Sequence, residues 1–368
     1  MFIEKIDKEI ILKPLQVVIG IVERKQTLPI LSNVLIEKIE NQLQFTTTDL
    51  EIQITTSIDL GILFDQNSSF TVNGKKLHEI LKVLPESSSI SIELKENKVQ
   101  IKSNKSRFSL QTLPAVDFPE ISNQLDNSKI ISLSQKMLRD LIYSVQYAMA
   151  QQDVRYYLNG VLIIIDGNQL KIVATDGHRL AFNMGNIEGF FEKQEIILPR
   201  KAVIELYKLL NDTDEIVNLE FSTQQVKITF SGITLITKVI EGKFPDYERV
   251  IPKYSNHLNM EKSIVQQALQ RAAILSSEKF RGVRFILTTN NLTIISNNSE
   301  QEEAHEEIET NYQGEPLDIG FNVNYLMDCL NNISNNVATF SFGDPNSSIL
   351  ISSPESLNFR YVVMPMRI

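Results

Sequence analysis

The sequence predicts an α+β protein built from three similar domains in a row, which combine antiparallel sheets with a few helices. Three observations lead to this prediction. One pattern, strand, helix, strand, strand, strand, occurs six times along the 368 residues. The connections between neighbouring strands are short, as antiparallel pairing allows. The chain is also too long for a single compact core, so its size favours two or three domains.

The six units form three pairs, and each pair is one predicted domain. Aligned on Val34, Val161 and Val283, the copies lie 127 and 122 residues apart. A repeat of this kind indicates one structural module that is used several times. Polar stretches near residues 127 and 256 separate the copies, and we therefore predict domains at 1–126, 127–255 and 256–368.

The helices are predicted from apolar residues that recur at the helical period of 3.6. In the segment 134–149, Leu138, Leu141, Ile142 and Val145 form one such stripe. Equivalent segments lie at 8–25, 74–84, 200–211, 262–271 and 324–332. We therefore expect about six helices, each with one face against a sheet.

The strands are predicted from alternation of apolar and polar residues, which buries one face only. The alternation is clear in residues 90–94 and 226–230. Asp166-Gly167, between two apolar runs, predicts a tight turn. We expect about twenty-four strands in antiparallel sheets, with the helices packed on one side.

Composition excludes several classes of protein. No apolar run approaches the length of a membrane span, and the charged N-terminus MFIEKIDKEI is unlike a signal peptide, so we predict a cytoplasmic protein without a membrane partner. The single Cys329, in the setting LMDCL, predicts a buried and unreactive helical thiol. The four His are scattered, and no G-x-x-x-x-G-K-[ST] motif occurs. We therefore expect neither a metal nor another cofactor.

The net charge of −9 argues by itself against nucleic acid, but the distribution of charge argues for it. The six helical segments hold 14 Lys and Arg and 6 Asp and Glu, a net charge of +8, which leaves −17 on the remainder. Lys136, Arg139 and Tyr143 lie opposite the apolar stripe of their helix. An ordinary solvated helix face remains an alternative, since surface helices often carry Lys. The last helix, with Asp328 and no Lys or Arg, departs from the pattern.

The chain ends in YVVMPMRI, residues 361–368, which is more apolar than most chain ends. One interpretation is a last strand whose side chains belong to a core. The other is a binding surface, for which the flexible Met side chain is well suited. Both hold if alternate residues face opposite sides. A hydrolase that uses Asp176 and His178 is a weaker alternative, because no nucleophile motif such as G-x-S-x-G accompanies them.

Several blocks of sequence are specific enough to indicate a family. They are QDVRYYLNG (152–160), VATDGHRLA (173–181), GKFPDY (242–247), RAAILSSEKFRGVR (271–284) and the terminal octet, with RFSLQTLPAVDFP (107–119) and TLPIL (27–31). Together they closely resemble the bacterial sliding clamps, the beta subunits of DNA polymerase III. The resemblance extends over the whole chain.

The resemblance implies the DNA clamp fold, a head-to-tail homodimer that closes as a ring around duplex DNA, with helices inside and sheets outside. It implies a non-catalytic processivity factor that slides without sequence specificity. The implied partners are the polymerase catalytic subunit, the clamp loader and other replication and repair proteins. A repeat-built enzyme and a β-rich scaffold that does not bind DNA remain the alternatives.

The resemblance also implies a pocket in which partners insert a short motif with apolar anchors. The positions that match it are Leu158, Thr175, Gly177, His178, Arg179, Leu180, Pro245, Arg249, Val250, Val362, Met364, Pro365, Met366 and Arg367.

For the seam between subunits, the matching positions are Lys75, Lys105, Arg107, Phe108, Leu110, Ile274, Leu275, Glu302, Glu303 and Glu306. An apolar centre with a charged rim is the usual anatomy of an interface. The alternative for the acidic run EQEEAHEE is a solvated loop.

For DNA contact, the resemblance selects Lys25, Gln152, Tyr156, Tyr157 and Arg200, and charge alone adds Arg24, Lys136 and Arg139. Lys and Arg would meet phosphates, and Tyr would stack or donate a hydrogen bond. The stretch ERKQTLPIL lacks the glycine common in the corresponding loop of relatives, which leaves the roles of Arg24 and Lys25 open.

Overall fold

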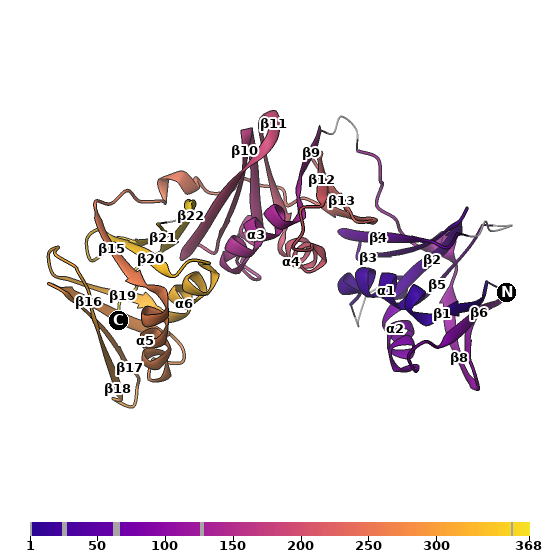
Figure 1. Cartoon of the computed structure of the whole chain (residues 1–368), viewed down its shortest axis with the longest axis horizontal. Coiled ribbons are helices and arrows are strands. Elements are labelled where there is room, and N and C mark those ends of the chain that lie inside the picture. Colours follow the sequence, from indigo (N-terminus) through magenta and orange to yellow (C-terminus); the bar gives the residue numbers. More distant parts are fainter. Residues whose placement is uncertain (1, 24–27, 62–66, 126–128, 355) are drawn as a thin grey trace. The chain divides into compact units, whose positions relative to one another are not determined.

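The computed structural model describes residues 2–23, 28–61, 67–125, 129–354 and 356–368, and this part of the chain contains six α-helices (Figure 1). They are α1 (Lys8–Val18), α2 (Gly74–Val83), α3 (Gln135–Val145), α4 (Arg200–Leu209), α5 (Lys262–Ile274) and α6 (Val323–Asn332). Each predicted helical segment overlaps one of them, so the number of helices is confirmed. The helix α3 is shorter than expected, because a 3-10 turn, η4 (Gln146–Ala148), replaces its last turn. The Met149 N–H closes this turn by donating to Gln146 O at 3.3 Å.

Three of the helices begin where a short polar side chain caps the first turn. Asp7, Asn73 and Asn322 precede α1, α2 and α6, and each accepts a hydrogen bond from a backbone N–H of that turn, at 2.8, 3.0 and 2.9 Å. Such caps satisfy backbone donors that have no partner within the helix. They place these helix starts directly after a strand.

The first sheet has twelve antiparallel strands and lies in one compact unit, formed by Met1–Lys136 and Ile204–Val239. Its order is β1 (Ile3–Asp7), β6 (Ser89–Lys95), β7 (Lys98–Ser103), β8 (Ser106–Leu113), β5 (Ser68–Asn73), β2 (Asn33–Ile39), β3 (Gln42–Thr48), β4 (Ile52–Asp59), β14 (Ile233–Lys238), β13 (Gln225–Phe230), β12 (Ile216–Phe221) and β9 (Lys129–Ser134).

Two further antiparallel sheets lie in a second compact unit, formed by Met137–Val203 and Ile240–Ile368. The six-stranded sheet has the order β10 (Gly160–Thr175), β11 (Arg179–Pro199), β22 (Ser356–Val363), β21 (Ile349–Ser353), β20 (Val337–Phe342) and β15 (Asn256–Glu261). The four-stranded sheet has the order β18 (Glu303–Glu309), β17 (Asn291–Asn297), β16 (Gly282–Thr288) and β19 (Leu317–Asn322).

The described residues form twenty-two strands rather than twenty-four, because β10 and β11 each span two of the predicted strands. Their pairing is irregular on both sides of Gly167. Gly167 has a φ of 61°, in the left-handed region that glycine adopts at little cost. The position at which the sequence predicts a tight turn is therefore the one at which the regular register is interrupted.

Strands from successive predicted domains pair with each other. In the first unit β4 pairs with β14, with Ile54 opposite Leu235. In the second unit β11 pairs with β22, with Leu180 opposite Val362. The last strand of one predicted domain thus extends a sheet of the domain before it. The boundaries near residues 127 and 256 remain a prediction.

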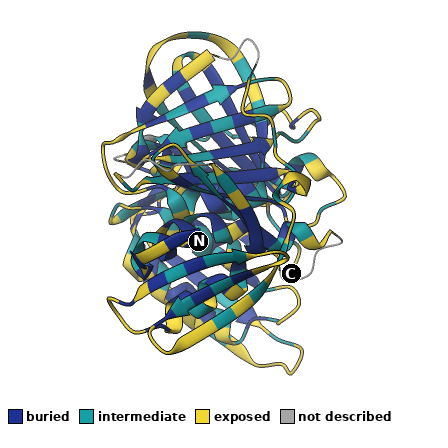
Figure 2. Ribbon diagram, turned by 90° about the vertical axis from the view of Figure 1, so that its right-hand side faces the viewer, coloured by how far each residue is buried: buried dark blue, intermediate teal, exposed yellow. Residues whose placement is uncertain are grey.

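The core follows the alternation seen in the sequence. Val226, Ile228 and Phe230 on β13 are 0, 1 and 4% exposed, while the residues between them are half-buried. Figure 2 shows the same arrangement, with buried segments along the strands and exposed residues at the turns. None of the described helices is long and apolar enough to cross a membrane.

The three predicted domains share one detail that the sequence does not reveal. The first residues of α1, α3 and α5 are Lys8, Gln135 and Lys262, and each backbone N–H donates to a carbonyl in the turn after the second helix of its domain, at 3.0, 2.8 and 2.8 Å. Lys8 Nζ and Lys262 Nζ also donate to carbonyls at the ends of α2 and α6, each at 2.7 Å. The cation at a helix C-terminus is favourable, because the carbonyls there lack helical partners.

Candidate functional site

The C-terminal strand β22 is part of a core, and the residues after it are not. Tyr361, Val362 and Val363 are fully buried, which agrees with the interpretation of a core strand. Met364 is 48% exposed and Ile368 55% exposed. The chain therefore leaves the sheet after Val363 and carries apolar side chains to the surface.

Two backbone hydrogen bonds hold this tail in place. Met364 N–H donates to His178 O at 2.9 Å, and Met366 N–H donates to Gly320 O at 2.8 Å. A Cβ on Gly320 would come within 2.8 Å of the Ile368 side chain and 2.4 Å of Met366 O. The close approach of the tail to β19 thus requires a glycine at this position.

Three of the predicted pocket residues come together from distant parts of the sequence. Leu158, Leu180 and Val362 belong to one buried apolar cluster, with Ile164 and Phe244. Half-buried aromatic and aliphatic side chains pack on this cluster, namely Tyr157, Phe182, Ile240, Tyr247, Ile251 and Tyr254. Of the other predicted members, Val250 and Met364 are exposed, and the Arg249 side chain is 86% exposed and paired with Asp246. The predicted pocket residues thus include buried members of one apolar cluster and exposed residues, among them Val250 and Met364.

The turn that precedes Leu180 is built by hydrogen bonds within the predicted pocket sequence. Asp176 Oδ1 accepts from the backbone N–H groups of His178 and Arg179, at 2.9 and 3.0 Å. Thr175 Oγ1 donates to Arg179 O at 2.6 Å. Gly177 has a φ of 88°. Because Asp176 bonds the backbone of His178 rather than its ring, this pair has the geometry of a turn and not of a base with its orienting carboxylate.

Arg179 is engaged in a network of polar groups that includes residues of α6. Its guanidinium donates to Asp328 Oδ2 at 2.5 Å, to Asp176 Oδ2 at 3.1 Å and to Tyr147 O at 2.6 Å. The group also lies 4.4 Å from the centre of the Tyr325 ring. Its side chain is only 10% exposed. Asp328, the residue that departs from the basic pattern of the helices, is thus paired.

Two buried titratable groups, the Tyr361 phenol and the Cys329 thiol, lie near the Arg179 network, and burial favours their neutral forms. Burial raises the pKa of the Tyr361 phenol and of the Cys329 thiol well above their usual values. Cys329 is buried on α6, which confirms the predicted buried helical thiol. A thiol in this setting is a poor nucleophile, because the thiolate is the reactive form.

The candidates for DNA contact lie in two places. Gln152 and Tyr156 are exposed on the loop before β10, and Tyr157 packs edge-on to Tyr156 with ring centres 5.9 Å apart. Arg200 is half-buried at the start of α4 and donates to Met149 O at 3.2 Å, and burial lowers the pKa of its guanidinium. Arg24 and Lys25 lie outside the described residues.

Arg155 stabilises the loop that carries Gln152, Tyr156 and Tyr157 through several hydrogen bonds. Its guanidinium bonds both oxygens of Asp153, at 3.1 and 2.9 Å, and the carbonyl of Asp176 at 3.1 Å. The hydrogen bonds from Arg155 lower the pKa of Asp153 to about 2. Arg155 thus also connects the loop to the turn at residues 175–179, a contact that leaves no signal in the sequence.

The seam candidates lie on or beside two strands, one in each unit: β8, which pairs with β5 only at Thr112 and Leu113, and β18, at the edge of its sheet. In the first unit, Arg107, Phe108 and Leu110 are on β8, whose residues alternate between exposed and half-buried, and a hollow of 770 Å³ runs beside Ser109–Leu113. Lys105 lies in the turn before β8, and Lys75 is in the first turn of α2.

In the second unit, Glu303 and Glu306 are on β18, a strand at the edge of its sheet, and Glu302 directly precedes it. Ile274, at the end of α5, is 77% exposed, and Leu275 follows it. Arg271 of the same chain binds both oxygens of Glu306, at 2.8 and 2.6 Å. Glu306 therefore already has a partner within its own chain.

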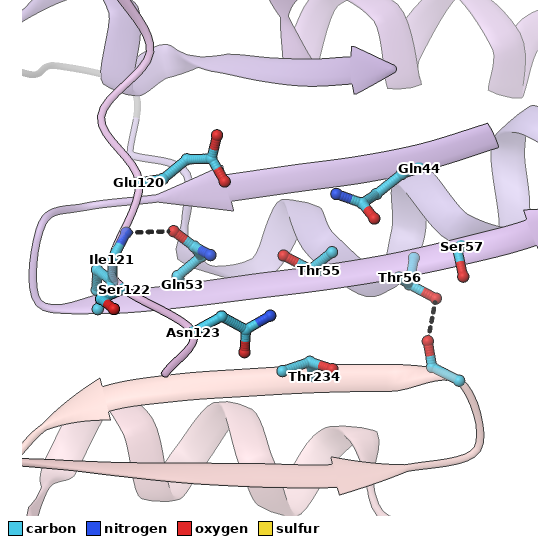
Figure 3. A pocket seen from close by; sticks show the side chains of 11 residues that line it. Gln44, Gln53, Thr55, Thr56, Ser57, Glu120, Ile121, Ser122, Asn123 and Thr234 are labelled. Atoms are coloured by element: carbon cyan, nitrogen blue, oxygen red, sulfur yellow. Dashed lines mark hydrogen bonds between the residues drawn. The ribbon is translucent and has the colours of Figure 1, made fainter. Parts of the chain in front are cut away.

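A polar pocket of 310 Å³ lies in the first unit where residues 120–123 cross the sheet (Figure 3). Gln53 accepts from Ile121 N–H at 2.7 Å, and Thr56 donates to Gly232 O at 3.2 Å. Burial and the negative charge of Glu120 raise the pKa of the nearby Glu37. The first bond fastens the segment that precedes the predicted domain boundary to β4, and the second joins β4 to the turn before β14. Among the described residues, no group of three or more His, Cys, Asp or Glu side chains is placed to hold a metal ion.

Comparison with known proteins assigns the whole chain to one family. Three family models match in succession: the N-terminal domain of the DNA polymerase III beta subunit at residues 1–122, its central domain at 132–246 and its C-terminal domain at 248–367. The beta sliding clamps of Pseudomonas aeruginosa, Vibrio cholerae and Escherichia coli are 44, 43 and 40% identical to the chain, each over 99% of both proteins.

Solved structures agree with the sequence comparison. The DNA polymerase III beta subunit of Pseudomonas aeruginosa matches with a TM-score of 0.95 and 42% identity, over 99% of this chain and all of the other. The beta subunit of Caulobacter crescentus matches with a TM-score of 0.93 and 35% identity, also over 99% of this chain and all of the other. A clamp of Pseudomonas aeruginosa bound to griselimycin matches with a TM-score of 0.93 and 43% identity, over 99% of both chains.

The repeated antiparallel sheets with few helices are therefore those of a DNA clamp, a class of non-catalytic proteins, which confirms the predicted fold class. Within that class, the chain belongs to the DNA polymerase III beta subunit family, the beta sliding clamps.

Proposed function

We propose that two copies of this chain close head to tail into a ring that encircles duplex DNA and tethers partner proteins to it. The observation that supports the ring is a pattern of strand pairing. β4 is the fourth strand of the first predicted domain and pairs with β14, the last strand of the second. In the second domain β10 spans two of the predicted strands, so the start of β11 corresponds to the fourth strand. It pairs with β22, the last strand of the third domain.

The repeat then calls for a third pairing, between β18 of the third domain and β8, the last strand of the first. Among the described strands, β18 pairs only with β17. Beyond its hairpin with β7, β8 pairs with β5 at just two positions, Leu113 and Thr112. A second copy supplies the missing partner for each edge, and two such contacts close the assembly.

The residues at these two edges are complementary. β8 carries Arg107 with Phe108 and Leu110, and β18 carries Glu303 and Glu306. Ile274, which is 77% exposed, adds apolar area beside the acidic strand. Burial of apolar side chains supplies affinity, and opposite charges fix orientation.

Encirclement makes tight contact with DNA unnecessary. A closed ring stays on the duplex by topology, so weak contacts to phosphates, which carry no sequence information, leave it free to slide. The helical segments carry a net charge of +8 against −17 elsewhere, which suits such contacts on one surface only. We assign them to Lys25, Gln152, Tyr156, Tyr157 and Arg200, with Arg24, Lys136 and Arg139.

The apolar site beside the C-terminal tail is the proposed docking site for the polymerase catalytic subunit, the clamp loader and other replication and repair proteins. Its buried floor and exposed Met364 suit a short peptide with two or three apolar anchors. Each anchor contributes about 1.5–3 kcal/mol before the costs of binding are subtracted. The affinity is then modest, and one partner protein can replace another at the site. A cytoplasmic location and the domain boundaries near residues 127 and 256 belong to the same proposal.

Nicked circular and linear duplex DNA of the same length test the ring. The protein, loaded on both by its loader, should persist on circles and leave linear DNA within seconds by sliding off the ends. A protein–DNA block at each end should restore the lifetime on linear DNA. Equal lifetimes on circular and unblocked linear DNA would rule out encirclement.

A further inference from the structure

A second cavity lies in the unit that contains the C-terminal strand, away from the apolar cluster. It measures 490 Å³ and is lined by α3, the start of α5, the end of α6 and the strands β11, β21 and β22. Its volume lies within the range of small-molecule sites, about 300–1,000 Å³. None of its lining residues is among those assigned to the docking site, the seam or DNA.

The floor of this cavity holds a buried polar group without a partner. Ser353 is 4% exposed, and within the described residues its Oγ makes no hydrogen bond. Leaving a buried hydroxyl without a hydrogen bond is unfavourable, because the group has lost its contact with water and gained nothing in return. Ser353 lines the cavity, but its hydroxyl is covered in the free protein, so a bound molecule has to displace neighbouring side chains to supply the missing hydrogen bond.

Two amide side chains at the end of α6 add a donor and an acceptor. Asn331 Oδ1 accepts from Gln266 Nε2 at 3.0 Å, which leaves the amide nitrogen of Asn331 for a ligand. Asn332 Nδ2 donates to Asp328 O at 2.7 Å, which leaves the amide oxygen of Asn332. Both side chains line the cavity. The Asn331 amide nitrogen can therefore donate to an acceptor of a planar ligand, and the Asn332 amide oxygen can accept from a neighbouring donor of the same ligand.

The remaining lining residues restrict the charge and shape of the ligand. Asp140 and Lys262 contribute one charge of each sign, so the cavity has no net charge and does not select a phosphate. Lys262 Nζ is also engaged with Ile333 O. Phe359, which is buried, and Tyr143, which is exposed, offer aromatic surface to a planar ring. An uncharged, planar ligand with hydrogen bonds along its edge fits these groups.

We propose that this cavity binds a nucleobase, and adenine best. Adenine presents an acceptor beside its exocyclic amino donor, the combination that Asn side chains recognise in nucleic acids. Aromatic side chains stack with bases of any kind. The base can come from a free nucleoside or from an unpaired position in DNA, and the site itself does not depend on encirclement.

The test uses the full-length protein and ligand-observed NMR titration. Adenosine should bind, and inosine, which lacks the exocyclic amino donor, should bind about fivefold to tenfold more weakly. Ser353→Ala and Asn331→Ala should each weaken adenosine binding by about tenfold, the effect of one lost hydrogen bond. Asn331 is exposed, so its substitution does not threaten the fold. Ser352→Ala, the neighbour on the same strand, is the matched control and should leave the affinity unchanged, because Ser352 does not line the cavity.

The outcomes separate the site from its alternatives. Absence of adenosine binding at millimolar concentration would show that water alone satisfies Ser353, and the proposal would fall. Equal affinity in both cavity variants would place the nucleoside elsewhere and would also overturn it. Competition by a single-stranded oligonucleotide would identify an unpaired base as the source, and lack of competition would identify a free nucleoside. The titration uses no DNA loaded with the clamp. A negative result would therefore not bear on the proposed ring, and evidence against the ring would not bear on nucleobase binding.

Discussion

Arg179 holds together several polar groups next to the proposed docking site. The resemblance placed it in the pocket, and its guanidinium is engaged with Asp176, Asp328 and the Tyr147 carbonyl. It joins β11, which contributes Leu180 to the apolar floor, to α6. We therefore expect Arg179 to position the apolar floor rather than to contact a partner peptide.

Replacing Arg179 by Met should lower the free energy of unfolding by about 3 kcal/mol, because the mostly buried carboxylate of Asp176 and the partly exposed one of Asp328 both lose their partner. Asp328→Asn should cost about 1 kcal/mol, and the double variant should cost less than the sum. Denaturant unfolding measures all three. Arg249→Met, which removes an exposed ion pair, is the control and should change stability by less than about 0.5 kcal/mol. Additive losses in the double variant would contradict a shared network.

Glu37 is a partly buried residue whose negative charge lowers the stability of the folded state. Burial and the charge of Glu120 raise its pKa above the ordinary value of 4.5, and a hydrogen bond from Gln44 opposes this only in part. The folded state thus holds the proton more tightly than the unfolded chain. Stability from this residue is fully present below pH 4.5 and is lost as the pH rises through the raised pKa.

Glu37→Gln should therefore stabilise the protein at pH 7 relative to pH 4, compared with the unchanged chain. Thermal or urea unfolding at several pH values measures the difference. The matched control is Glu86→Gln, which removes a charge from an exposed turn of the same unit. A gain that is the same at both pH values, or larger at pH 4, would contradict this account.

At the scale of elements, the helix pairs depend on lysines that reach a neighbouring helix end. Lys8 is 4% exposed at the start of α1, and its Nζ donates to Leu84 O after α2. Lys8→Met should lower the free energy of unfolding by about 1–3 kcal/mol, because a carbonyl at that helix end is left without its partner. Lys13→Met, on the exposed face of the same helix, should have an effect within about 0.5 kcal/mol. Equal effects of the two substitutions would show that the contact does not stabilise the pair.

The tail after β22 is the second element with a testable role. Met364→Ala combined with Met366→Ala should weaken a partner peptide at least tenfold, because the rim of the docking site loses apolar surface. The dimer should persist, since neither residue lies on β8 or β18. Peptide titration and sedimentation measure the two properties separately. Phe190→Ala, an exposed apolar residue of β11, is the control, and an unchanged peptide affinity in the double Met variant would remove the tail from the site.

At the scale of the whole molecule, the proposed ring depends on two edges that the single chain leaves open. Ile274→Asp should convert the dimer to a monomer, because it places a charge in an apolar interface next to the acidic strand β18. Sedimentation velocity measures this. Ile264→Asp, on an exposed position of the same helix, should leave the dimer intact. A dimer that survives Ile274→Asp would exclude this edge as the seam.

Much of the fold was predictable, because the local patterns were regular. The apolar stripe of α3 and the alternation along β13 are repeated in sequence and buried as expected. The strand count was too high because β10 and β11 each continue through a predicted break. The end of α3 was placed too late, since a 3-10 turn has the same apolar spacing as one more helical turn.

The site was predictable only in part. The residues assigned to the proposed docking site come from a resemblance of whole blocks, which identifies positions but not the direction of side chains. Contacts between distant residues, such as Arg155 with Asp176 or Arg271 with Glu306, leave no signal in a single sequence. The cavity at Ser353 was missed for the same reason, because its lining residues come from six separate elements.

The sequence by itself determined that this chain repeats one module and buries one face of each strand and helix, because periodicity is a local property. The tertiary structure alone decided which edges meet, as in the pairing of β4 with β14 and of β11 with β22. It also decided which polar groups are left over, at Ser353 and along β8 and β18. Those outcomes depend on packing between residues far apart in the chain, and local sequence cannot encode them one segment at a time.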